Sequence, residues 1–391
     1  MNAFPWSATA VFWALPFHPY TCELIMATKV GIVGCGNICG IYFKNIERFR
    51  NLETKACADI IMESAAAKAE EFHCAAVSVD ELLADPEIEI VLNLTIPAAH
   101  FSVAMRALEA GKHVYSEKPF ALTLEEAQQL LATAQKKGLR IGCAPDTFLG
   151  GAHQTCRKLI EDGWIGEPVS VDGFILSHGP ERWHANPEFF YKKGAGPLMD
   201  MGPYYITAMI NMLGPVKTVA AMSRISFPQR RIESKPKFGT MIDVEIPTHV
   251  SGVMEFASGA IGTLITSFDT WANQLPRIEV HGTRGSLAVP DPNQFGPVVK
   301  INIPGRTDGW KEVPFCYGFL ENSRGVGLSD MANAIQSGRP HRASGQLATH
   351  ALDVMLSLLE AGEVKRHVDL STTVEKPAIL PMGLTETETE P

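Results

Sequence analysis

The sequence predicts two domains, an α/β domain with a parallel sheet and then an α+β domain with a large, mainly antiparallel open sheet. The chain has 391 residues, which is more than one ordinary core of roughly 100 to 200 residues holds. Between residues 29 and 143, short apolar runs alternate with amphipathic stretches of helical length. After residue 146, apolar and polar residues alternate singly between tight glycine turns. We therefore expect the first domain at 26–146 and the second at 147–370.

The apolar runs of the first part have the length and continuity of parallel strands that are buried on both faces. We expect these strands at 29–33, 55–60, 88–95, 112–116 and 139–144. The stretches between them carry apolar residues at three- and four-residue spacing, which is typical of helices that cover a sheet. We expect these helices at 37–48, 64–72, 98–110 and 123–137.

The second part begins with one more helix, at 153–162, and then has the pattern of strands. HVSGVMEF and AIGTLITSFDTW are joined by ASG, and RIEVHG and GSLAVPD are joined by TR. Both pairs predict antiparallel hairpins with tight turns. Helices at 329–336 and 346–361 follow. A tail at 371–391, with prolines and the acidic run TETETE, is expected to be mobile.

Residues 1–25 contain aromatic residues and prolines but neither Lys nor Arg, which argues against a secretory signal. Their apolar stretch, 8–15, is much shorter than the roughly 18 to 20 residues that a membrane span needs. We expect a disordered extension here, with the functional chain beginning at Met26.

Charge and cysteine content narrow the class of function. The formal net charge of −9 disfavours an extended phosphate-binding surface for nucleic acid or an anionic membrane. The eight cysteines are scattered, without a CxxC pair or the histidine spacing of a zinc site. We therefore expect no metal, reduced thiols in the cytoplasm, and a site for a small molecule.

The first strand runs directly into a glycine-rich loop that opens a helix, GCGNICG at 34–40. The first glycine permits a tight turn, and the second lets backbone amides approach a pyrophosphate at the helix N-terminus. Asp59 ends the next strand, where its carboxylate can bind two ribose hydroxyls and repel a 2′-phosphate. The pattern predicts a Rossmann dinucleotide site that favours NAD and leaves NADP open. Its residues are Gly34, Gly36, Asn37, Ile38 and Asp59, with Cys39 at the usual third glycine position.

Three further motifs follow in order, TIPAAH at 95–100, AGKHVYSEKP at 110–119 and GAGPLMDMG at 194–202. Together with the glycine loop and Asp59, the series resembles the Gfo/Idh/MocA family, the relatives of glucose-fructose oxidoreductase and inositol dehydrogenase. The resemblance extends from Met26 to about Ala361. It implies an NAD(P)-binding Rossmann domain and a second domain that binds substrate and forms oligomers.

Lys118 is the residue on which the chemistry depends. Oxidation of an alcohol requires a proton to leave oxygen as hydride leaves carbon, so a titratable group must contact that hydroxyl. Lys118 follows the fourth predicted strand directly, at the sheet edge where ligands of parallel sheets bind. Burial or a cationic nicotinamide would lower its pKa, and a nearby carboxylate would raise it. The resemblance implies that Lys118 contacts nicotinamide ribose and substrate beside a cis Pro119; the alternative is a solvated lysine near a turn.

The resemblance also implies further site residues. The cofactor set is Thr95, Ile96, Pro97, His100, Glu117, Lys118 and Asp146. The catalytic set is Lys118, Asp200 and Tyr204, and Trp183 and His184 join these three as substrate contacts. The chain departs from the family at Tyr204, where relatives have a histidine, and at Thr207, where many have an aspartate. Tyr204 can alternatively pack within its helix, and His100 can begin the surface of the following one.

These observations predict an oxidoreductase that transfers a hydride between NAD(P) and a CH–OH group of a sugar, polyol or keto-sugar, with Lys118 as proton donor and acceptor. Two alternatives stay open. The enzyme can retain NAD and use transient oxidation for elimination or glycoside cleavage, or the chain can be a catalytically silent NAD-binding sensor. Because the strands of the second domain need cover on their far side, we expect a homodimer or homotetramer.

Overall fold

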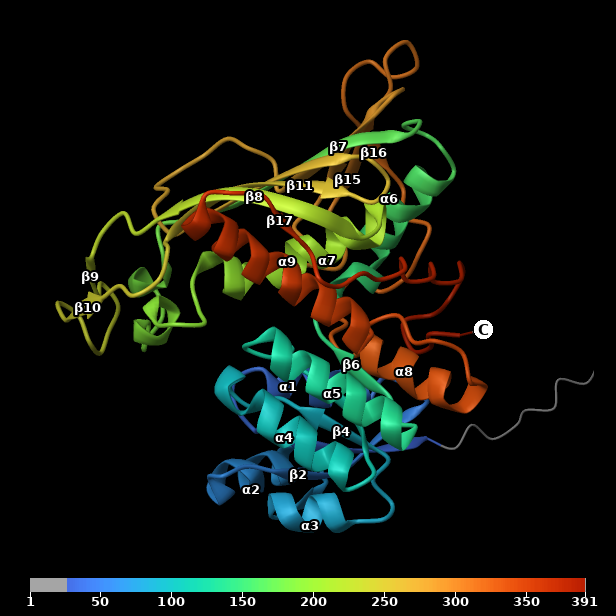
Figure 1. Ribbon diagram of the computed structural model, residues 1–391. Coiled ribbons are helices and arrows are strands. Elements are labelled where there is room, and N and C mark those ends of the chain that lie inside the picture. The colour runs from blue at the N-terminus through green and yellow to red at the C-terminus, as the bar shows by residue number, and fades with distance from the viewer. Residues whose placement is uncertain (1–26, 391) are drawn as a thin grey trace, which may run out of the picture.

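The computed structural model describes residues 27–390, which form two domains (Figure 1). The N-terminal domain is built on a parallel sheet and the C-terminal domain on a larger, mostly antiparallel sheet, so the predicted fold class is confirmed. The expected extension at 1–25 and the expected start at Met26 lie outside the described residues. None of the helices within residues 27–390 is long and apolar enough to cross a membrane.

The N-terminal domain alternates strands and helices along the chain. Its elements are β1 (Thr28–Val33), α1 (Cys39–Ile46), β2 (Leu52–Ala58), α2 (Met62–Glu71), β3 (Ala75–Ala76), α3 (Val79–Ala84), β4 (Ile90–Asn93), α4 (Pro97–Glu109), β5 (His113–Ser116), α5 (Leu124–Lys137) and β6 (Ile141–Cys143). The sheet order is β3-β2-β1-β4-β5-β6, with every pair parallel. The strand order reverses between β1 and β4, and ligands of such sheets bind at the carboxyl ends of the strands beside that point. The sequence pattern missed β3 and α3, which are too short to show a period.

The C-terminal domain is built on a nine-stranded sheet of order β16-β15-β14-β13-β7-β12-β11-β8-β17 within the described residues. Its elements are a 3₁₀ turn (Thr147–Leu149), α6 (Gly151–Glu161), β7 (Pro168–Leu176), two 3₁₀ turns (Pro180–Arg182 and Glu188–Tyr191), α7 (Pro197–Leu213), β8 (Val216–Arg224), β9 (Gln229–Arg231), β10 (Met241–Asp243), β11 (His249–Phe256), β12 (Ile261–Ser267), β13 (Ile278–Gly282), β14 (Ser286–Val289), β15 (Val299–Asn302), β16 (Lys311–Val313), α8 (Val326–Ser337), α9 (Gly345–Val364) and β17 (Val368–Asp369). Only β7 and β12 pair in parallel in this sheet.

The two faces of the large sheet differ. Helices α6, α7 and α9 pack on one face, between the sheet and the N-terminal domain (Figure 1). Residues of β11 alternate between buried and less buried positions, as expected of a strand with one covered face. The opposite face carries no helix in the described part of the chain.

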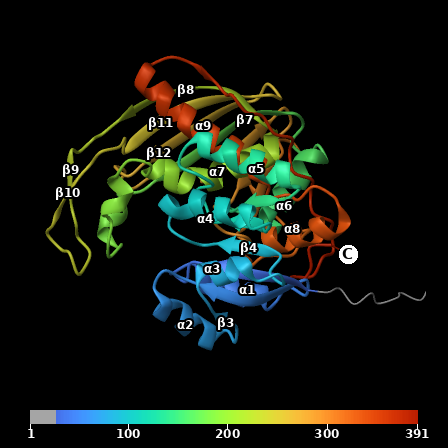
Figure 2. The ribbon, with the colours of Figure 1, turned by 60° about the horizontal axis from the view of Figure 1, so that its bottom comes forward.

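An arm extends from one end of this domain and carries the β9–β10 hairpin (Figure 2). It has a small hydrophobic cluster separate from the main core, composed of Phe190, Tyr191, Ile232, Ile242, Val244 and Phe268. Buried Arg230 holds the arm together by ion pairs with Glu181 and Asp269. The arm is therefore a packed substructure of its own.

After the large sheet, the chain returns to the N-terminal domain. Asn45 donates hydrogen bonds from Nδ2 to the carbonyl oxygens of Asn322 and Arg324, and Asn51 donates one to Ser329. Ser344 forms an isolated β-bridge with Gly142, next to the last strand of the parallel sheet. The segment before α8 thus lies at the domain boundary, next to α1, although the two are far apart in the sequence.

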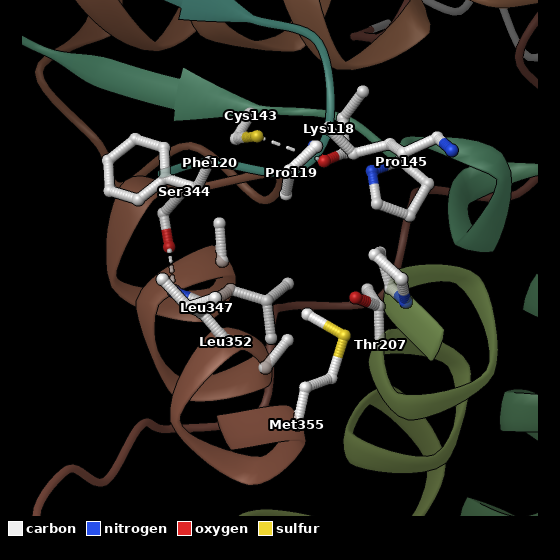
Figure 3. A pocket seen from close by; sticks show the side chains of 14 residues that line it. Lys118, Pro119, Phe120, Cys143, Pro145, Thr207, Ser344, Leu347, Leu352 and Met355 are labelled. Atoms are coloured by element: carbon white, nitrogen blue, oxygen red, sulfur yellow. Dashed lines mark hydrogen bonds between the residues drawn. The ribbon is translucent and has the colours of Figure 1, made fainter. Parts of the chain in front are cut away.

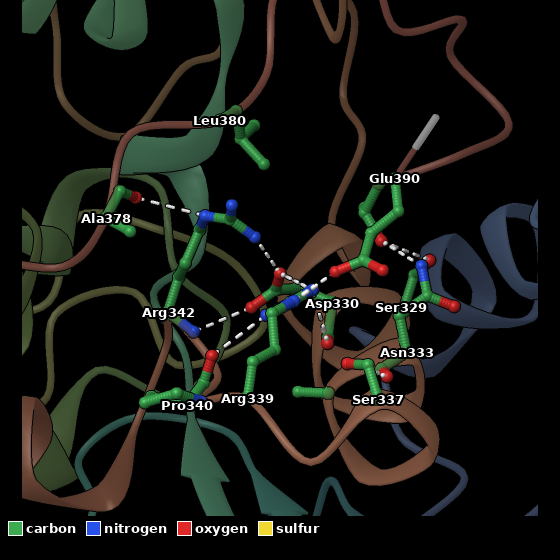
Figure 4. Close-up of polar contacts among 12 residues, drawn as sticks. Ser329, Asp330, Asn333, Ser337, Arg339, Pro340, Arg342, Ala378, Leu380 and Glu390 are labelled. Atoms are coloured by element: carbon green, nitrogen blue, oxygen red, sulfur yellow. Dashed lines mark hydrogen bonds and ion pairs between the residues drawn. The ribbon is translucent and has the colours of Figure 1, made fainter.

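The tail at 371–390 packs against the protein, unlike the mobile tail that composition suggested. Buried Asp330 binds the side chains of Arg339 and Arg342, and Arg342 also donates to the carbonyl oxygens of Ala378 and Ile379 (Figure 4). The three glutamates of the TETETE run each form an ion pair with an arginine. The ion pairs join Glu386 to Arg48, Glu388 to Arg50 and Glu390 to Arg339.

Candidate active site

The glycine loop between β1 and α1 has room for an anionic group. Gly34 has φ +105°, and a Cβ there would lie 2.6 Å from the backbone of Leu94, so only glycine fits. A Cβ on Gly36 would meet nothing within 4 Å, and Gly36, Asn37 and Ile38 are exposed. The first turn of α1 carries neither an acidic residue nor a side-chain cap. Its free amides and helix dipole therefore suit a phosphate group.

Asp59 lies beside this loop at the end of β2. Its Oδ2 accepts a hydrogen bond of 2.7 Å from the amide of Cys35, and its Oδ1 accepts one of 2.9 Å from the amide of Ile61. The two amides hold the carboxylate in a fixed orientation next to the glycine loop. This is the position from which a carboxylate can accept ribose hydroxyls.

His100 is buried in the first turn of α4 and links two loops, so it is not a surface residue. It is only 1% exposed. Nδ1 lies 2.7 Å from the carbonyl oxygen of Pro119, and Nε2 lies 2.9 Å from that of Thr95. The motif around Thr95 therefore lies directly against the Lys118–Pro119 segment. Ile96, at 70% exposure, is on the open side of this loop.

Glu117 fixes the backbone on which Lys118 is carried. Its Oε1 accepts a 2.7 Å hydrogen bond from the hydroxyl of Tyr42, and its Oε2 accepts a 2.9 Å bond from the amide of Lys118. Tyr42 is fully buried in α1. The next peptide bond, Lys118–Pro119, is cis, as the resemblance implied.

The amine of Lys118 points toward α7. Nζ lies 3.0 Å from Oδ1 of Asp200, 2.9 Å from the Asp200 carbonyl oxygen, and 5.3 Å from the centre of the Tyr204 ring. Burial lowers the pKa of Lys118, but Asp200, Tyr204 and Glu117 together raise it further, so the net pKa lies above that of an ordinary lysine. Lys118 is therefore an ammonium group held by a carboxylate, and the three predicted catalytic residues lie together.

Tyr204 is buried, with 8% exposure, and lies under the amine of Lys118. Burial raises the pKa of the Tyr204 hydroxyl, while Lys118 and Arg324 act in the opposite direction. Sequence reasoning missed Arg324 and Tyr42, because neither belongs to a motif. Arg324 reaches the site only through the returning segment before α8.

Asp146 follows β6 and binds the backbone at the start of α8. Its Oδ2 accepts hydrogen bonds of 2.8 Å from the amide of Gly325 and 3.0 Å from that of Gly327, at the start of α8. Burial raises its pKa to about 6, with the two amides acting in the opposite direction. The hydrogen-bond partners of the Asp146 side chain are thus the two backbone amides that flank Val326, and the cofactor contact that we expected of it stays a prediction.

Trp183 and His184 lie on the arm, and the structure does not bring them to Lys118. Trp183 is 70% exposed, and its ring packs against His184 and Phe190. Ser234 donates a 2.5 Å hydrogen bond to the carbonyl oxygen of His184. Their substrate contacts stay a prediction.

Two cavities adjoin this site. A small, partly open one of about 20 Å³ lies between the domains (Figure 3), with mostly apolar walls that include Lys118, Pro119, Pro203, Thr207 and Met355. It holds about one water molecule and is too small for a sugar. The other, of about 350 Å³, is lined by Asn293, Gln294, Phe295, Gly296, Pro297, Leu320, Glu321, Asn322 and Arg324.

Two family models match the chain. Residues 28–144 match an oxidoreductase family with an NAD-binding Rossmann fold, and residues 153–288 match the Gfo/Idh/MocA C-terminal domain. A D-xylose dehydrogenase of Paenarthrobacter nicotinovorans is 24% identical, over 75% of this chain and 80% of its own length. A 1,5-anhydro-D-fructose reductase of Ensifer adhaerens is 26% identical, over 75% of this chain and 84% of its own.

Solved structures have the same fold. An NAD-binding oxidoreductase from Klebsiella pneumoniae aligns with a TM-score of 0.78 and 22% identity, over 88% of this chain and 100% of its own. Levoglucosan dehydrogenase in complex with NADH aligns with a TM-score of 0.76 and 22% identity, over 89% and 100%. The N-terminal domain is thus an NAD-binding Rossmann domain, and the open space over Gly36, the free helix N-terminus and Asp59 fit that cofactor.

Proposed function

The chain belongs to the Gfo/Idh/MocA family of oxidoreductases, and on that premise we propose that it transfers a hydride between NAD and a sugar, polyol or keto-sugar. The observation that carries the proposal is the Lys118 ammonium, fixed by Asp200 at the carboxyl end of β5. Relatives named for D-xylose, 1,5-anhydro-D-fructose and levoglucosan support a sugar-like substrate.

Bound NAD supplies the hydride acceptor, and NADH the donor. The protein supplies the proton chemistry. Because its pKa is raised, Lys118 carries a proton at neutral pH and can donate it to a carbonyl oxygen as that oxygen gains charge. In the direction of alcohol oxidation, the neutral amine takes the hydroxyl proton, and positive charge near it lowers its pKa. By taking that proton Lys118 becomes an ammonium group again, the form that Asp200 holds in place and favours.

We assign the cofactor preference to Asp59. Its carboxylate is fixed by two amides, and a 2′-phosphate at the ribose would meet this negative charge. NADH is therefore expected to bind at least about tenfold more tightly than NADPH, since one repulsive contact of about 1.4 kcal/mol suffices. Fluorescence titration with both cofactors measures the ratio, and equal affinities would remove Asp59 from this role.

The test of the proposed function is a Lys118→Ala variant, assayed with sugars, inositols and keto-sugars and with NAD and NADP. The wild type is expected to produce or consume NADH with one of these compounds. The variant should lose about 100-fold or more in kcat, the usual contribution of a general acid or base, and still bind NADH. Lys55→Ala is the matched control, because Lys55 is a partly exposed lysine on β2 that pairs with Glu87.

Three other results would each contradict one part of the proposed function. Unchanged turnover in Lys118→Ala would exclude Lys118 as the proton carrier. Substrate cleavage or elimination without net NADH would show transient oxidation on retained NAD. Tight NAD binding without turnover on the whole panel would identify a sensor.

We also propose that the chain assembles into a homodimer or homotetramer in the cytoplasm, through the uncovered face of the large sheet. Neighbouring strands present apolar side chains there, with Met222 74%, Val253 46% and Ile261 50% exposed. Pairing such sheet faces would bury them. The cysteines within residues 27–390 are free thiols, which agrees with a reducing compartment. A monomer by light scattering at micromolar concentration would contradict the assembly.

A further inference from the structure

Tyr42 joins the first helix of the NAD-binding domain to the segment that carries Lys118. It lies on α1, the helix whose free N-terminal amides suit a phosphate group, and it is 0% exposed. Its hydroxyl donates a 2.7 Å hydrogen bond to Oε1 of Glu117. Burial raises the pKa of this hydroxyl well above its ordinary value, and Glu117 raises it further. Tyr42 therefore keeps its proton and is the donor in this bond.

The carboxylate of Glu117 continues this connection to Lys118. Its Oε2 accepts a 2.9 Å hydrogen bond from the amide of Lys118, and the Glu117 amide donates one of 2.9 Å to the carbonyl oxygen of Asn93 on β4. Glu117 is only 8% exposed, and a buried carboxylate is costly unless its oxygens accept hydrogen bonds. Here one oxygen is bonded to α1 and the other to the residue that carries the amine.

Lys118 is consequently held at both ends. Its amine at the tip is 3.0 Å from Oδ1 of Asp200 on α7, in the C-terminal domain. Its backbone is fixed through Glu117 to α1, in the N-terminal domain. Proton transfer needs close alignment, and a misplacement of about 1 Å can cost about 100-fold in rate. The position of the backbone therefore affects the chemistry of the amine.

We propose that Tyr42 is a positioning residue, which acts through Glu117 to fix Lys118 relative to the helix that binds the dinucleotide phosphates. This inference rests on the proposed function. Tyr42 contacts neither substrate nor cofactor in this role, and its covalent bonds do not change. One helix thus sets the place of the pyrophosphate at its N-terminus and, through two hydrogen bonds, the place of the Lys118 backbone. The nicotinamide and the amine thereby keep their relative position.

The experiment is Tyr42→Phe in the full chain, which removes only the hydroxyl, assayed with the substrate found by the panel. We expect kcat to fall by about 10- to 100-fold, with the Kd for NADH and the KM for the sugar unchanged. The solvent deuterium isotope effect on kcat should rise, because proton transfer becomes slower. Tyr115→Phe is the matched control, with kcat unchanged. Tyr115 is also 0% exposed, and its hydroxyl has no hydrogen-bond partner among residues 27–390.

Two substitutions of Glu117 separate position from charge. Glu117→Met removes both acceptors, so kcat should fall as in Tyr42→Phe, and adding Tyr42→Phe should cost nothing more. Glu117→Gln keeps both bonds, since its oxygen accepts from the Lys118 amide and its NH₂ group donates to the Tyr42 oxygen. Its maximal kcat should stay near that of the wild type. Burial lowers the pKa of Lys118, while Asp200, Tyr204 and Glu117 raise it, so the lost charge should move the pH profile of alcohol oxidation to lower pH.

Several results would overturn this inference. It fails if Tyr42→Phe has wild-type kcat, if its loss is matched by Tyr115→Phe or by an equal loss of NADH affinity, or if it costs as much in the Glu117→Met background as in the wild type. If Tyr42→Phe does not fold, as judged by its melting temperature, equal kcat in Glu117→Met and Glu117→Gln refutes it. A wild type without turnover on the panel refutes the proposed function instead, so the two failures are distinguishable.

Discussion

Gly36→Ala separates folding of the glycine loop from cofactor binding. A Cβ at Gly36 meets nothing within 4 Å, and its φ is outside the left-handed region. Alanine should therefore leave stability unchanged or raise it by about 0.4 to 1 kcal/mol, because the unfolded chain loses freedom. The added methyl group projects into the space where the pyrophosphate is expected. Overfilling a close contact costs about 1 to 3 kcal/mol, which weakens NADH binding by about 5- to 150-fold.

NADH fluorescence titration and a thermal melt of the same samples measure both effects. Gly40→Ala is the matched control, because a Cβ there also meets nothing within 4 Å but lies on α1. Gly34→Ala should lose both stability and NADH binding, since its φ is +105° and its Cβ would lie 2.6 Å from the Leu94 backbone. If Gly36→Ala binds NADH with wild-type affinity, the loop does not hold the pyrophosphate and the assignment is refuted.

Two further predictions concern stability. Asp330→Ala leaves the buried guanidinium of Arg342 without its carboxylate, which should lower the free energy of unfolding by about 3 to 5 kcal/mol. Urea unfolding measures this loss, and limited proteolysis should cleave the released tail. A loss below about 1 kcal/mol would contradict the role of this cluster. Burial lowers the pKa of His153 and His341 from 6.5 to about 4, so the unfolded chain binds two protons that the native state does not. The free energy of unfolding should therefore fall as pH falls from about 6.5 toward 4, by about 2 kcal/mol per histidine at pH 5. Asp146 partly offsets this loss, because its raised pKa of about 6 lets the native state bind a proton before the unfolded chain does. Equal unfolding midpoints at pH 7.5 and pH 5 would contradict the prediction.

The order of elements and the position of Lys118 followed from sequence because both depend on local periodicity. Parallel strands share one edge for their carboxyl ends, so the residue after β5 had to lie near the glycine loop after β1. The burial of His100 did not follow. Its ring contacts a carbonyl oxygen five residues away and another 19 residues away, and spacing alone does not show where a loop places its carbonyl groups.

Sequence did not reveal partners that lie far along the chain. Asp146 follows a strand of the parallel sheet, where a carboxylate suggests a ligand contact, yet its partners are amides 179 and 181 residues later. The acidic tail had the composition of a solvated run, and its partners include Arg48 and Arg50 near the start of the chain. Composition describes what a segment can bind, and only the fold decides whether a partner is present.

Tyr204 shows why the departure from a motif has to be interpreted with its surroundings. Beside Lys118, a histidine can give or take a proton, whereas a buried tyrosine with a raised pKa keeps its own. The change would leave the site one proton carrier short if Tyr204 stood alone. Arg324 alters this balance in part, because together with Lys118 it opposes the rise in the pKa of the Tyr204 hydroxyl that burial causes. The two residues are 120 positions apart, so the chemistry of this site depends on the chain segment that returns between the domains.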